Sequence, residues 1–394
     1  MVKIAYITRI NFFSGKAHVY TITKTCEALS QVNGIEINLV STDSSLIDQK
    51  ERDNFFALQN VSKKFNIVSL LSWANTFKTN PNFLVYNLST FLANLTLLKY
   101  VFRERKNVDI VYFRDHLILP VILFARYFLK KKVVYESHYI LTKSLGQWLT
   151  ERSVSVSNGV VAIAVALKDY YQKFNKNIVI SFCASSDKEK FKTDLPPSHF
   201  RKEIGLHENM FYLVYTGNID VTGNGDSYGV EDVVKALPHM PQDVCFIAVG
   251  KKTKGEHPLE KLAKSLGIYE RFKCTPWVLR KEVKDYVLSA DILIIPKSGA
   301  KPGNSPTKMF EYLATGRPIV AADTLPMREV LHDKVNASLV DYNSPQAWAE
   351  AVNFIRQHQE YREKIMSQAM QDADLYTWEA RAQTIGSFVK KIYA

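Results

Sequence analysis

The segment from Ser305 to Thr324, SPTKMFEYLATGRPIVAADT, holds residue types that together can bind a phosphate and a sugar. Ser305 is a good N-cap and Pro306 a good first helical residue, so a short helix is predicted to begin here. The N–H groups of a helix start favour an anion. Lys308 adds a positive charge, and Glu311 can accept hydrogen bonds from two neighbouring hydroxyls. The segment therefore predicts a site for a diphosphate and a ribose, with an ordinary capped helix as the alternative.

The composition favours a globular protein of two domains. The chain has 394 residues, of which 46% are hydrophobic and 23% charged, and this length exceeds one compact core. The four cysteines are scattered without a CxxC pair, so neither a disulfide framework nor a zinc site is indicated. The start, MVKIAYIT, lacks the features of a secretory signal, and the longest apolar run, Leu117 to Leu129, is too short to span a bilayer. We therefore expect a cytoplasmic protein.

The positive charge lies almost entirely in the first half of the chain. The net charge is +12, and residues 1–190 contribute +11 of it, from 25 Lys and Arg against 14 Asp and Glu. Basic residues interleaved with aromatic ones predict contact with an anionic membrane surface or a nucleic acid, and a merely soluble basic surface is the alternative. The candidate basic residues are Lys63, Lys64, Lys78, Lys99, Arg103, Arg105, Lys106, Lys130, Lys131 and Lys132.

Short β-branched or aromatic runs alternate with amphipathic stretches, which is typical of parallel sheets covered by helices. The strands expected in the first half are Val2 to Ile7, Ile35 to Ser41, Asp109 to Phe113, Lys132 to Glu136, Gly159 to Ile163 and Ile178 to Ser181. Those expected in the second half are Phe211 to Thr216, Val244 to Val249, Phe272 to Thr275, Ile292 to Ile295, Ile319 to Ala322 and Ala337 to Val340. We therefore predict two successive α/β domains that face a cleft, with a linker near residue 190.

An apolar stretch with helical spacing and few charges covers residues 83 to 102, FLVYNLSTFLANLTLLKYVF. Basic residues follow it at once. A helix in the core or on a domain face is favoured over one that is seated in a membrane or binds an acceptor.

Polar residues follow several predicted strands of the first half, at the edge where a site is expected. Gly15 lies in the loop after the first strand and allows close approach of a ligand. Arg114 and His116 follow one later strand, and Glu136 and His138 lie at the end of the next. A lone histidine at a strand end is more often structural, but two on adjacent strand ends favour a site.

The second half has a similar set. Gly217 and Asn218 end one strand, and Lys297 ends another that lies close in order to the segment at Ser305. A loop with three glycines leads into a helix predicted over Val230 to Leu237. These features converge on one edge of one sheet, which strengthens the interpretation as a phosphate and ribose site.

The ordered set of motifs resembles that of the family 4 glycosyltransferases of the GT-B fold over nearly the whole chain. YTGN, YGVEDVVKAL, AVG, SADILIIP, the segment at Ser305 and YTWEARAQTIGSFVKKI occur in the family's order and approximate spacing, and KIAYIT and VVYESH are also similar. The resemblance implies two Rossmann-like domains, one over 1–190 for the acceptor and one over 191–376 for the donor. A helix over 377–394 would cross back onto the first domain.

The resemblance also implies a retaining, hexosyl-type transfer from a nucleotide-diphosphate sugar, with a UDP-sugar favoured. Glu311 matches the second glutamate of the family's E-x7-E motif, which holds the ribose, and His138 resembles a strand-end histidine that contacts the donor sugar. Together with Lys308 these are the catalytic candidates. The donor-binding candidates are Gly15, Gly217, Asn218, Val278, Lys297, Asn304, Ser305, Pro306, Thr307, Lys308 and Glu311. The acceptor-side candidates are Arg114, His116 and Glu136.

Three positions depart from the family pattern. Gly303 stands where the first glutamate of E-x7-E is expected, and Asn218 and Tyr228 stand where an arginine and a lysine are expected. A diphosphate in a partly dehydrated cleft still needs counter-charge. The replacements that we expect are Lys297, Lys301 and Lys308 for the charge, and Asn304 or the backbone for the glutamate.

No acidic pair of the DxD kind follows a strand, so neither a metal nor another cofactor is expected. Lys308, the helix start and the Gly15 loop would stabilise the leaving diphosphate. The resemblance implies that an oxygen of this diphosphate assists the incoming hydroxyl, without a covalent enzyme nucleophile.

The sequence thus favours a cytoplasmic glycosyltransferase, peripheral on the inner face of the membrane, that builds bacterial surface polysaccharide on a glycan or lipid-linked acceptor. Two alternatives stay open. A nucleotide-sugar epimerase of the same fold would act without an acceptor. A nucleic-acid-binding α/β protein would explain the basic half but not Glu311, so no nucleic-acid partner is expected.

Overall fold

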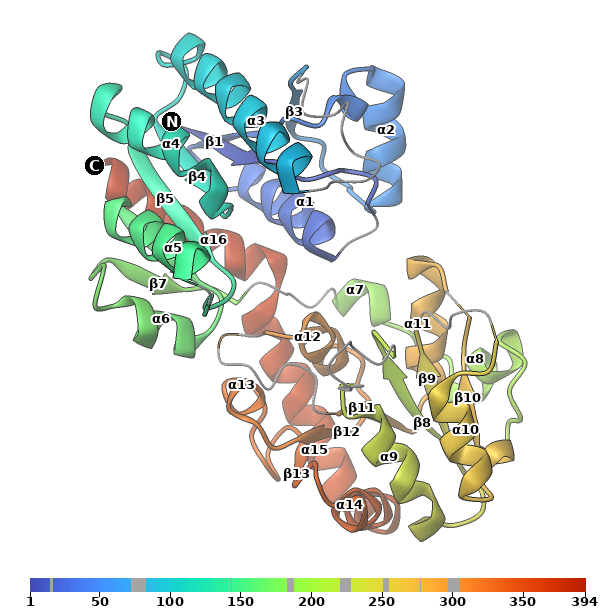
Figure 1. Ribbon diagram of the computed structural model, residues 1–394. Helices are drawn as coiled ribbons and strands as arrows, with labels where there is room; N and C mark the ends of the chain where they lie inside the picture. Colours follow the sequence, from blue (N-terminus) through green and yellow to red (C-terminus); the bar gives the residue numbers. More distant parts are fainter. Residues whose placement is uncertain are drawn as a thin grey trace. The chain divides into compact units, whose positions relative to one another are not determined.

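The computed structural model describes residues 1–14, 17–71, 83–142, 144–182, 188–219, 228–250, 255–276, 278–296, 303 and 305–394. They form two compact units (Figure 1), one of Met1–Cys183 with Trp378–Ala394 and one of Ala184–Thr377. The predictions for Gly15, Lys297, Lys301 and Asn304 lie outside the described residues.

The unit boundaries follow from the packing of two helices. The first boundary comes ahead of the linker expected near residue 190, because α7 (Lys188–Phe191) packs against α11 (Arg280–Ser289) of the second unit. The last helix, α16 (Trp378–Tyr393), packs against α1 (Ala17–Ser30). It therefore returns to the first unit, as expected.

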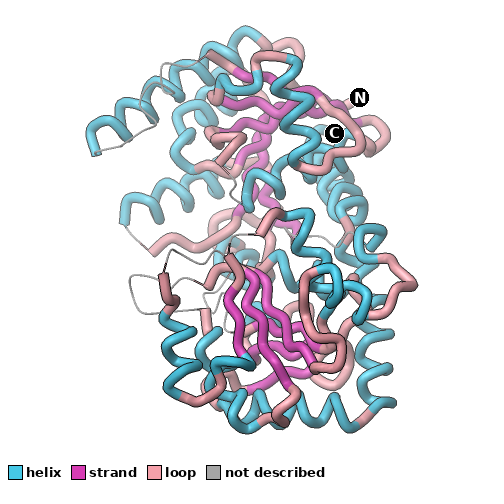
Figure 2. Tube along the Cα trace, turned by 90° about the vertical axis from the view of Figure 1, so that its right-hand side faces the viewer, coloured by secondary structure: helices cyan, strands magenta, loops and turns pink. Residues whose placement is uncertain are grey.

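A seven-stranded parallel sheet in the order β3-β2-β1-β4-β5-β6-β7 forms the centre of the first unit (Figure 2). The order reverses direction at β1, and ligands bind in such sheets beyond the carboxyl ends of the strands at this point. The strands are β1 (Val2–Thr8), β2 (Ile35–Ser41), β3 (Asn66–Ser69), β4 (Ile110–Phe113), β5 (Lys132–Ser137), β6 (Gly159–Ala162) and β7 (Ile178–Ile180). β3 was not predicted, since its four residues carry too little periodicity.

Helices cover this sheet. They are α1 (Ala17–Ser30), α2 (Gln49–Leu58), α3 (Phe83–Arg103), α4 (Leu119–Leu123), a π-helix (Phe124–Phe128), α5 (Ser144–Val156), α6 (Val165–Tyr171) and α16 (Trp378–Tyr393). The apolar run from Leu117 to Leu129 is divided among a 3₁₀ turn (His116–Ile118), α4 and the π-helix. The Asp115 carboxylate caps the turn by accepting a hydrogen bond from the Leu117 N–H at 3.0 Å.

The second unit repeats this arrangement with six parallel strands in the order β10-β9-β8-β11-β12-β13. The strands are β8 (Phe211–Thr216), β9 (Val244–Val249), β10 (Phe272–Cys274), β11 (Ile292–Ile295), β12 (Ile319–Ala322) and β13 (Ser338–Val340). The helices are α7 (Lys188–Phe191), α8 (Pro197–Glu203), α9 (Val230–Ala236), α10 (Pro258–Ser265), α11 (Arg280–Ser289), α12 (Thr307–Leu313), α13 (Leu325–Arg328), α14 (Pro345–Gln357) and α15 (Gln359–Asp372). Here β8 takes the place of β1, so the reversal lies between β8 and β11.

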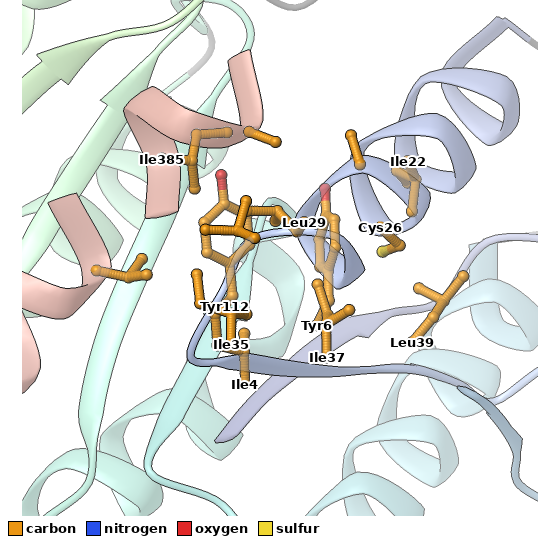
Figure 3. Packing of buried hydrophobic residues seen from close by; sticks show 14 of the residues in the cluster. Ile4, Tyr6, Ile22, Cys26, Leu29, Ile35, Ile37, Leu39, Tyr112 and Ile385 are labelled. Carbon is orange, nitrogen blue, oxygen red and sulfur yellow. The ribbon is translucent and has the colours of Figure 1, made fainter. Parts of the chain in front are cut away.

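Alternate residues of β1 and β4 build the core between the first sheet and helices α1 and α16 (Figure 3). The rings of Tyr6 and Tyr112 pack edge to face with their centroids 4.8 Å apart. Their hydroxyls point away from the sheet toward the helices. Around them pack Ile4, Ile22, Cys26, Leu29, Ile35, Ile37, Leu39 and Ile385.

The predicted start of the helix at Ser305 is wrong by one residue. Pro306 is the N-cap of α12, the helix begins at Thr307, and no side chain caps it. The fixed φ of proline suits this extended cap position as well as the first helical one.

Candidate functional site

A buried carboxylate lies at the end of β5, beside the reversal of the first sheet. The Glu136 side chain is 1% exposed. One of its oxygens lies 2.5 Å from His138 Nε2. The other accepts a hydrogen bond from the Tyr112 hydroxyl at 2.5 Å and lies 2.9 Å from an Nη of Arg381. Both oxygens are therefore engaged inside the protein, and one of them holds His138. The acceptor-side role of Glu136 stays a prediction.

Arg381 reaches this carboxylate from α16, although 245 positions separate it from Glu136 in the chain. Its guanidinium also donates to the carbonyls of Ser181 and Phe182, at 2.6 and 2.8 Å, and to the Thr25 hydroxyl at 3.2 Å. The side chain is 2% exposed. One arginine thus joins α16, α1 and the segment after β7 around the carboxylate.

The sequence reasoning missed Arg381, yet a signal was present. In α16 the residue lies on the same face as Trp378, Ala382, Ile385 and Val389, all of which are buried. A charged residue on the apolar face of a helix needs a buried partner. This placement therefore predicts an internal ion pair.

The network sets the protonation of His138. Burial and the nearby Arg114 charge lower the pKa of His138 to about 4, against the opposing effect of Glu136. Burial by itself would raise the pKa of Glu136, but Arg381, the His138 hydrogen bond and Arg114 together bring it well below its usual range. At neutral pH a neutral imidazole thus donates Nε2–H to a carboxylate, which leaves the lone pair on Nδ1.

Arg114 and His116 lie on the same edge of the sheet. Phe113 pairs with Tyr135 in the register, so Arg114 is level with Glu136. Burial lowers the pKa of His116, and its Nδ1 is buried with no hydrogen-bond partner among the described residues. These candidates thus lie at the ends of two adjacent strands, and their acceptor-side role stays a prediction.

In the second unit, the side chain of Lys308 extends from α12 to the end of β8. Its ammonium lies over the ring of Tyr215, 3.9 Å from the centroid. Loss of water around this group lowers the pKa of Lys308 to about 7, against the opposing effect of Glu311. Within the described part of the chain no hydrogen-bond or ion-pair partner is found for the ammonium. An anion placed here would restore its full charge.

Gly217 provides the space for this ammonium. A Cβ at Gly217 would lie 2.6 Å from Lys308 Nζ and 2.7 Å from the Tyr215 hydroxyl oxygen. The residue also has a φ of +149°, which side-chain-bearing residues rarely adopt. Space and backbone conformation therefore both favour glycine at this predicted donor-binding position.

Two tyrosine hydroxyls hold the loop that carries Gly217. The Tyr312 hydroxyl oxygen of α12 accepts a hydrogen bond from the Thr216 N–H at 2.8 Å. The Tyr215 hydroxyl donates to the Asn218 carbonyl at 2.8 Å. Sequence reasoning singled out neither tyrosine. Both belong to motifs that it did use, YTGN and the segment at Ser305.

Four of the remaining donor-side candidates lie at or in α12, and two others lie in other loops. Ser305, Pro306, Thr307 and Glu311 are partly buried around α12, and the Ser305 hydroxyl has no hydrogen-bond partner among the described residues. Val278 precedes α11 and is partly buried, whereas the Asn218 side chain is exposed.

The structure also explains the glycine that replaces the expected first glutamate. Gly303 is buried and has a φ of +87°, in the region where a side chain is strained. Tyr228, at the position of the expected lysine, has a φ of +57°. Both departures thus lie in loops with left-handed backbone conformations.

Metal-ligand groups and membrane-spanning helices were also sought among the described residues. Those residues contain no group of three or more His, Cys, Asp or Glu side chains that could hold a metal ion. Nor does any helix within them combine the length and apolar character required to cross a bilayer.

Parts of the chain are similar in sequence to known proteins. Residues 200–372 match the model of the family described as Glycosyl transferases group 1. This match lies within the second unit. The D-inositol 3-phosphate glycosyltransferase of Xylanimonas cellulosilytica is 26% identical over 46% of this chain and 42% of its own length. Spore coat protein SA of Bacillus subtilis is 22% identical over 66% of this chain and 65% of its own length. The match thus spans less than half of the first of these curated relatives.

Solved structures resemble the whole chain. Sucrose-phosphate synthase from Thermosynechococcus elongatus has a TM-score of 0.75 at 14% identity, over 100% of this chain and 99% of that one. Anabaena HepE in complex with UDP-glucose has a TM-score of 0.72 at 17% identity, over 99% and 100%. The predicted fold, with two α/β units of the GT-B kind, is confirmed. Assignment to family 4 stays a prediction.

Proposed function

We propose that this protein is a glycosyltransferase that moves a sugar from a nucleotide-diphosphate sugar to a glycan or lipid-linked acceptor. The observation that carries the proposal is the Lys308 ammonium at the end of β8, with its lowered pKa. A diphosphate supplies counter-charge beyond that of Glu311. A UDP-sugar is the favoured donor, because HepE, with a similar fold, has been solved with UDP and with UDP-glucose.

The donor side of the proposal uses the residues around α12. Lys308 and the N–H groups at the helix start hold the diphosphate. Glu311 accepts hydrogen bonds from the ribose hydroxyls, and the backbone near Val278 flanks the base. Gly217 leaves room for the ammonium.

The chemistry of the proposal is a retaining, metal-independent transfer. As the bond to the sugar breaks, negative charge develops on the leaving diphosphate, and Lys308 stabilises it. We assign His138 to the donor sugar. Its neutral ring, fixed by Glu136 through Nε2, would accept a hydrogen bond from a sugar hydroxyl at Nδ1. A diphosphate oxygen would assist the incoming acceptor hydroxyl.

The proposed setting is the synthesis of bacterial surface polysaccharide at the inner face of the membrane. The excess charge of +11 in residues 1–190 favours an anionic lipid surface as the place of work.

Calorimetric titration with UDP tests the site. The variants Lys308→Ala and Glu311→Ala are each expected to weaken binding by about 1 to 3 kcal/mol, the contribution of a charge-assisted hydrogen bond. Lys364→Ala removes an exposed lysine from α15 and serves as the matched control, with unchanged affinity. Wild-type affinity for UDP in both site variants would contradict the proposed binding of UDP by Lys308 and Glu311.

Thermal-shift screening against UDP-, GDP-, ADP- and CMP-linked sugars then identifies the donor. Incubation of that donor with and without acceptor separates transfer from epimerisation. The anomeric configuration of the product, read by NMR, tests retention: an inverted product would refute the retaining mechanism.

A further inference from the structure

The outer side of α3 exposes large apolar side chains from its first turn to its last. Five exposed side chains lie along one side of the helix at the spacing of successive turns, with exposed fractions of 75, 45, 60, 47 and 52%. We call them the α3 stripe: Leu84, Leu88, Phe91, Leu95 and Phe102. The 18 steps along the helix from Leu84 to Phe102 span about 27 Å at ~1.5 Å per residue.

The inner face of the same helix is apolar too. Leu97, Tyr100 and Val101 are buried in the core against the sheet, and Ala93 is also buried. A surface helix normally carries polar residues on its outer side. Yet α3 contains no Asp or Glu, and its outer side consists mainly of Leu and Phe. Packing in the core therefore explains the apolar inner side of α3 but not its apolar outer side.

Basic and aromatic residues surround the C-terminal end of the stripe. The Arg105 guanidinium lies over the Phe102 ring, 4.5 Å from its centroid, and the ring of Phe124 in the π-helix is 6.5 Å from that of Phe102. Phe128, stacked on Phe124, is 78% exposed. The basic residues in and beside these two segments are Lys99, Arg103, Arg105, Lys106, Arg126, Lys130, Lys131 and Lys132.

The C-terminal end of the stripe carries a net positive charge. Glu104 is the one acidic residue between Phe83 and Lys106, and it pairs with Arg103 at 3.0 Å. Apolar side chains on a helix with Lys and Arg beside them are the pattern of helices that lie in the interface of an anionic bilayer. Exposed aromatic residues such as Phe128 suit the same boundary.

We infer that the α3 stripe, together with the basic end formed by α3 and the π-helix, is a surface that binds anionic lipid bilayers. The leucine and phenylalanine side chains would enter the boundary of the acyl chains, while the lysines and arginines contact lipid headgroups. This inference deepens the proposed function, since it names the surface that would bring the protein to a lipid-linked acceptor. Lipid binding itself requires no catalysis.

The test is co-sedimentation of the full chain with vesicles. Vesicles of phosphatidylcholine with about a third phosphatidylserine are compared with pure phosphatidylcholine, at low and high salt, since the attraction between charges is screened by salt. Wild-type protein is expected to bind the anionic vesicles at low salt, and to bind at least tenfold more weakly at high salt or to pure phosphatidylcholine. No binding to anionic vesicles at low salt would overturn the inference.

Two variants separate the apolar from the basic part. Leu88→Gln with Phe91→Gln is expected to weaken binding at least tenfold at every salt concentration. Lys99→Glu with Lys106→Glu is expected to weaken binding at low salt and to flatten the salt dependence. Leu375→Gln, which changes a side chain that is 69% exposed in the second unit, is the matched control and should bind as wild type.

The same variants distinguish this inference from the proposed function. All are surface changes, so their melting temperatures and their affinities for UDP should match those of the wild type. UDP binding without vesicle binding would refute the lipid surface alone, and vesicle binding without UDP binding would refute the nucleotide site alone. A dimer that dissociates on Leu88→Gln with Phe91→Gln would show that the stripe binds a second copy of the chain instead.

Discussion

The two units differ in how far the protein neutralises a buried charge at the end of the sheet. In the first unit the buried Glu136 carboxylate meets a guanidinium, an imidazole and a phenol within 3 Å, so its charge is neutralised by the protein itself. In the second unit the Lys308 ammonium lies on an aromatic ring, with Glu311 as its opposing charge. The first arrangement is complete without a ligand, whereas the second gains from an anion. The neutralised Glu136 network holds His138 in a fixed position and protonation state. The Lys308 ammonium, which is only partly neutralised, is suited to bind an anion.

Removal of Arg381 is expected to have the largest effect, because it leaves a carboxylate buried and unpaired. Arg381→Met should lower the free energy of unfolding by about 3 to 5 kcal/mol, as measured by urea denaturation of the full chain. Arg152→Met removes an exposed arginine of α5 and should change stability little. Adding Glu136→Gln to Arg381→Met should recover part of the loss. A loss below 1 kcal/mol in Arg381→Met would contradict a large contribution of Arg381 to the free energy of unfolding.

Acid should destabilise the first unit through His138. The unfolded imidazole takes up a proton near pH 6.5, while burial keeps the pKa of His138 in the folded protein at about 4. Stability contributed by the neutral ring is therefore present above pH 6.5 and falls by about 3 kcal/mol as the pH drops to 4. Urea denaturation at stepped pH measures this. His138→Gln should flatten the slope between pH 6.5 and 5, before the carboxylates titrate, and an unchanged slope would contradict the assignment.

Binding of the nucleotide sugar should depend on pH through Lys308. Above its lowered pKa of about 7 the free ammonium loses its proton, and it must regain it to pair with the diphosphate. Affinity for a UDP-sugar, whose diphosphate diester does not titrate here, should therefore fall by up to about tenfold per pH unit above pH 7.

Calorimetry in buffers of different ionisation enthalpy measures the proton uptake directly. Lys308→Arg keeps its charge throughout this range, so it should bind without proton uptake. Uptake that persists in Lys308→Arg would place the titrating group elsewhere.

A methyl group at Gly217 should have the smallest effect. Gly217→Ala places a Cβ 2.6 Å from Lys308 Nζ, and the flexible lysine can move away. We expect UDP affinity and stability each to fall by about 1 kcal/mol, the latter from the strain at positive φ. Gly205→Ala also alters a glycine at positive φ, but nothing lies within 4 Å of its Cβ, so it should change stability alone. Equal UDP affinity of Gly217→Ala and Gly205→Ala would show that Gly217 does not belong to the nucleotide site.

Much of the fold was accessible from local patterns. Runs such as Ile35–Ser41 and Val244–Val249 are buried strands because β-branched and aromatic residues fit a sheet that is covered on both faces. The segment at Ser305 likewise placed Lys308 and Glu311 on one short helix. The order of the strands was not readable, because periodicity reports the environment of a residue and not which strand lies beside it.

The sequence by itself determined which residues carry charge and which segments form helices and strands, since these depend on side chains a few positions apart. The tertiary structure alone decided three further properties. It paired Arg381 with Glu136 across the chain, and it lowered the pKa of Lys308 by enclosing its ammonium. It also selected which apolar face of α3 enters the core, because both faces are apolar and only contact with the sheet distinguishes them.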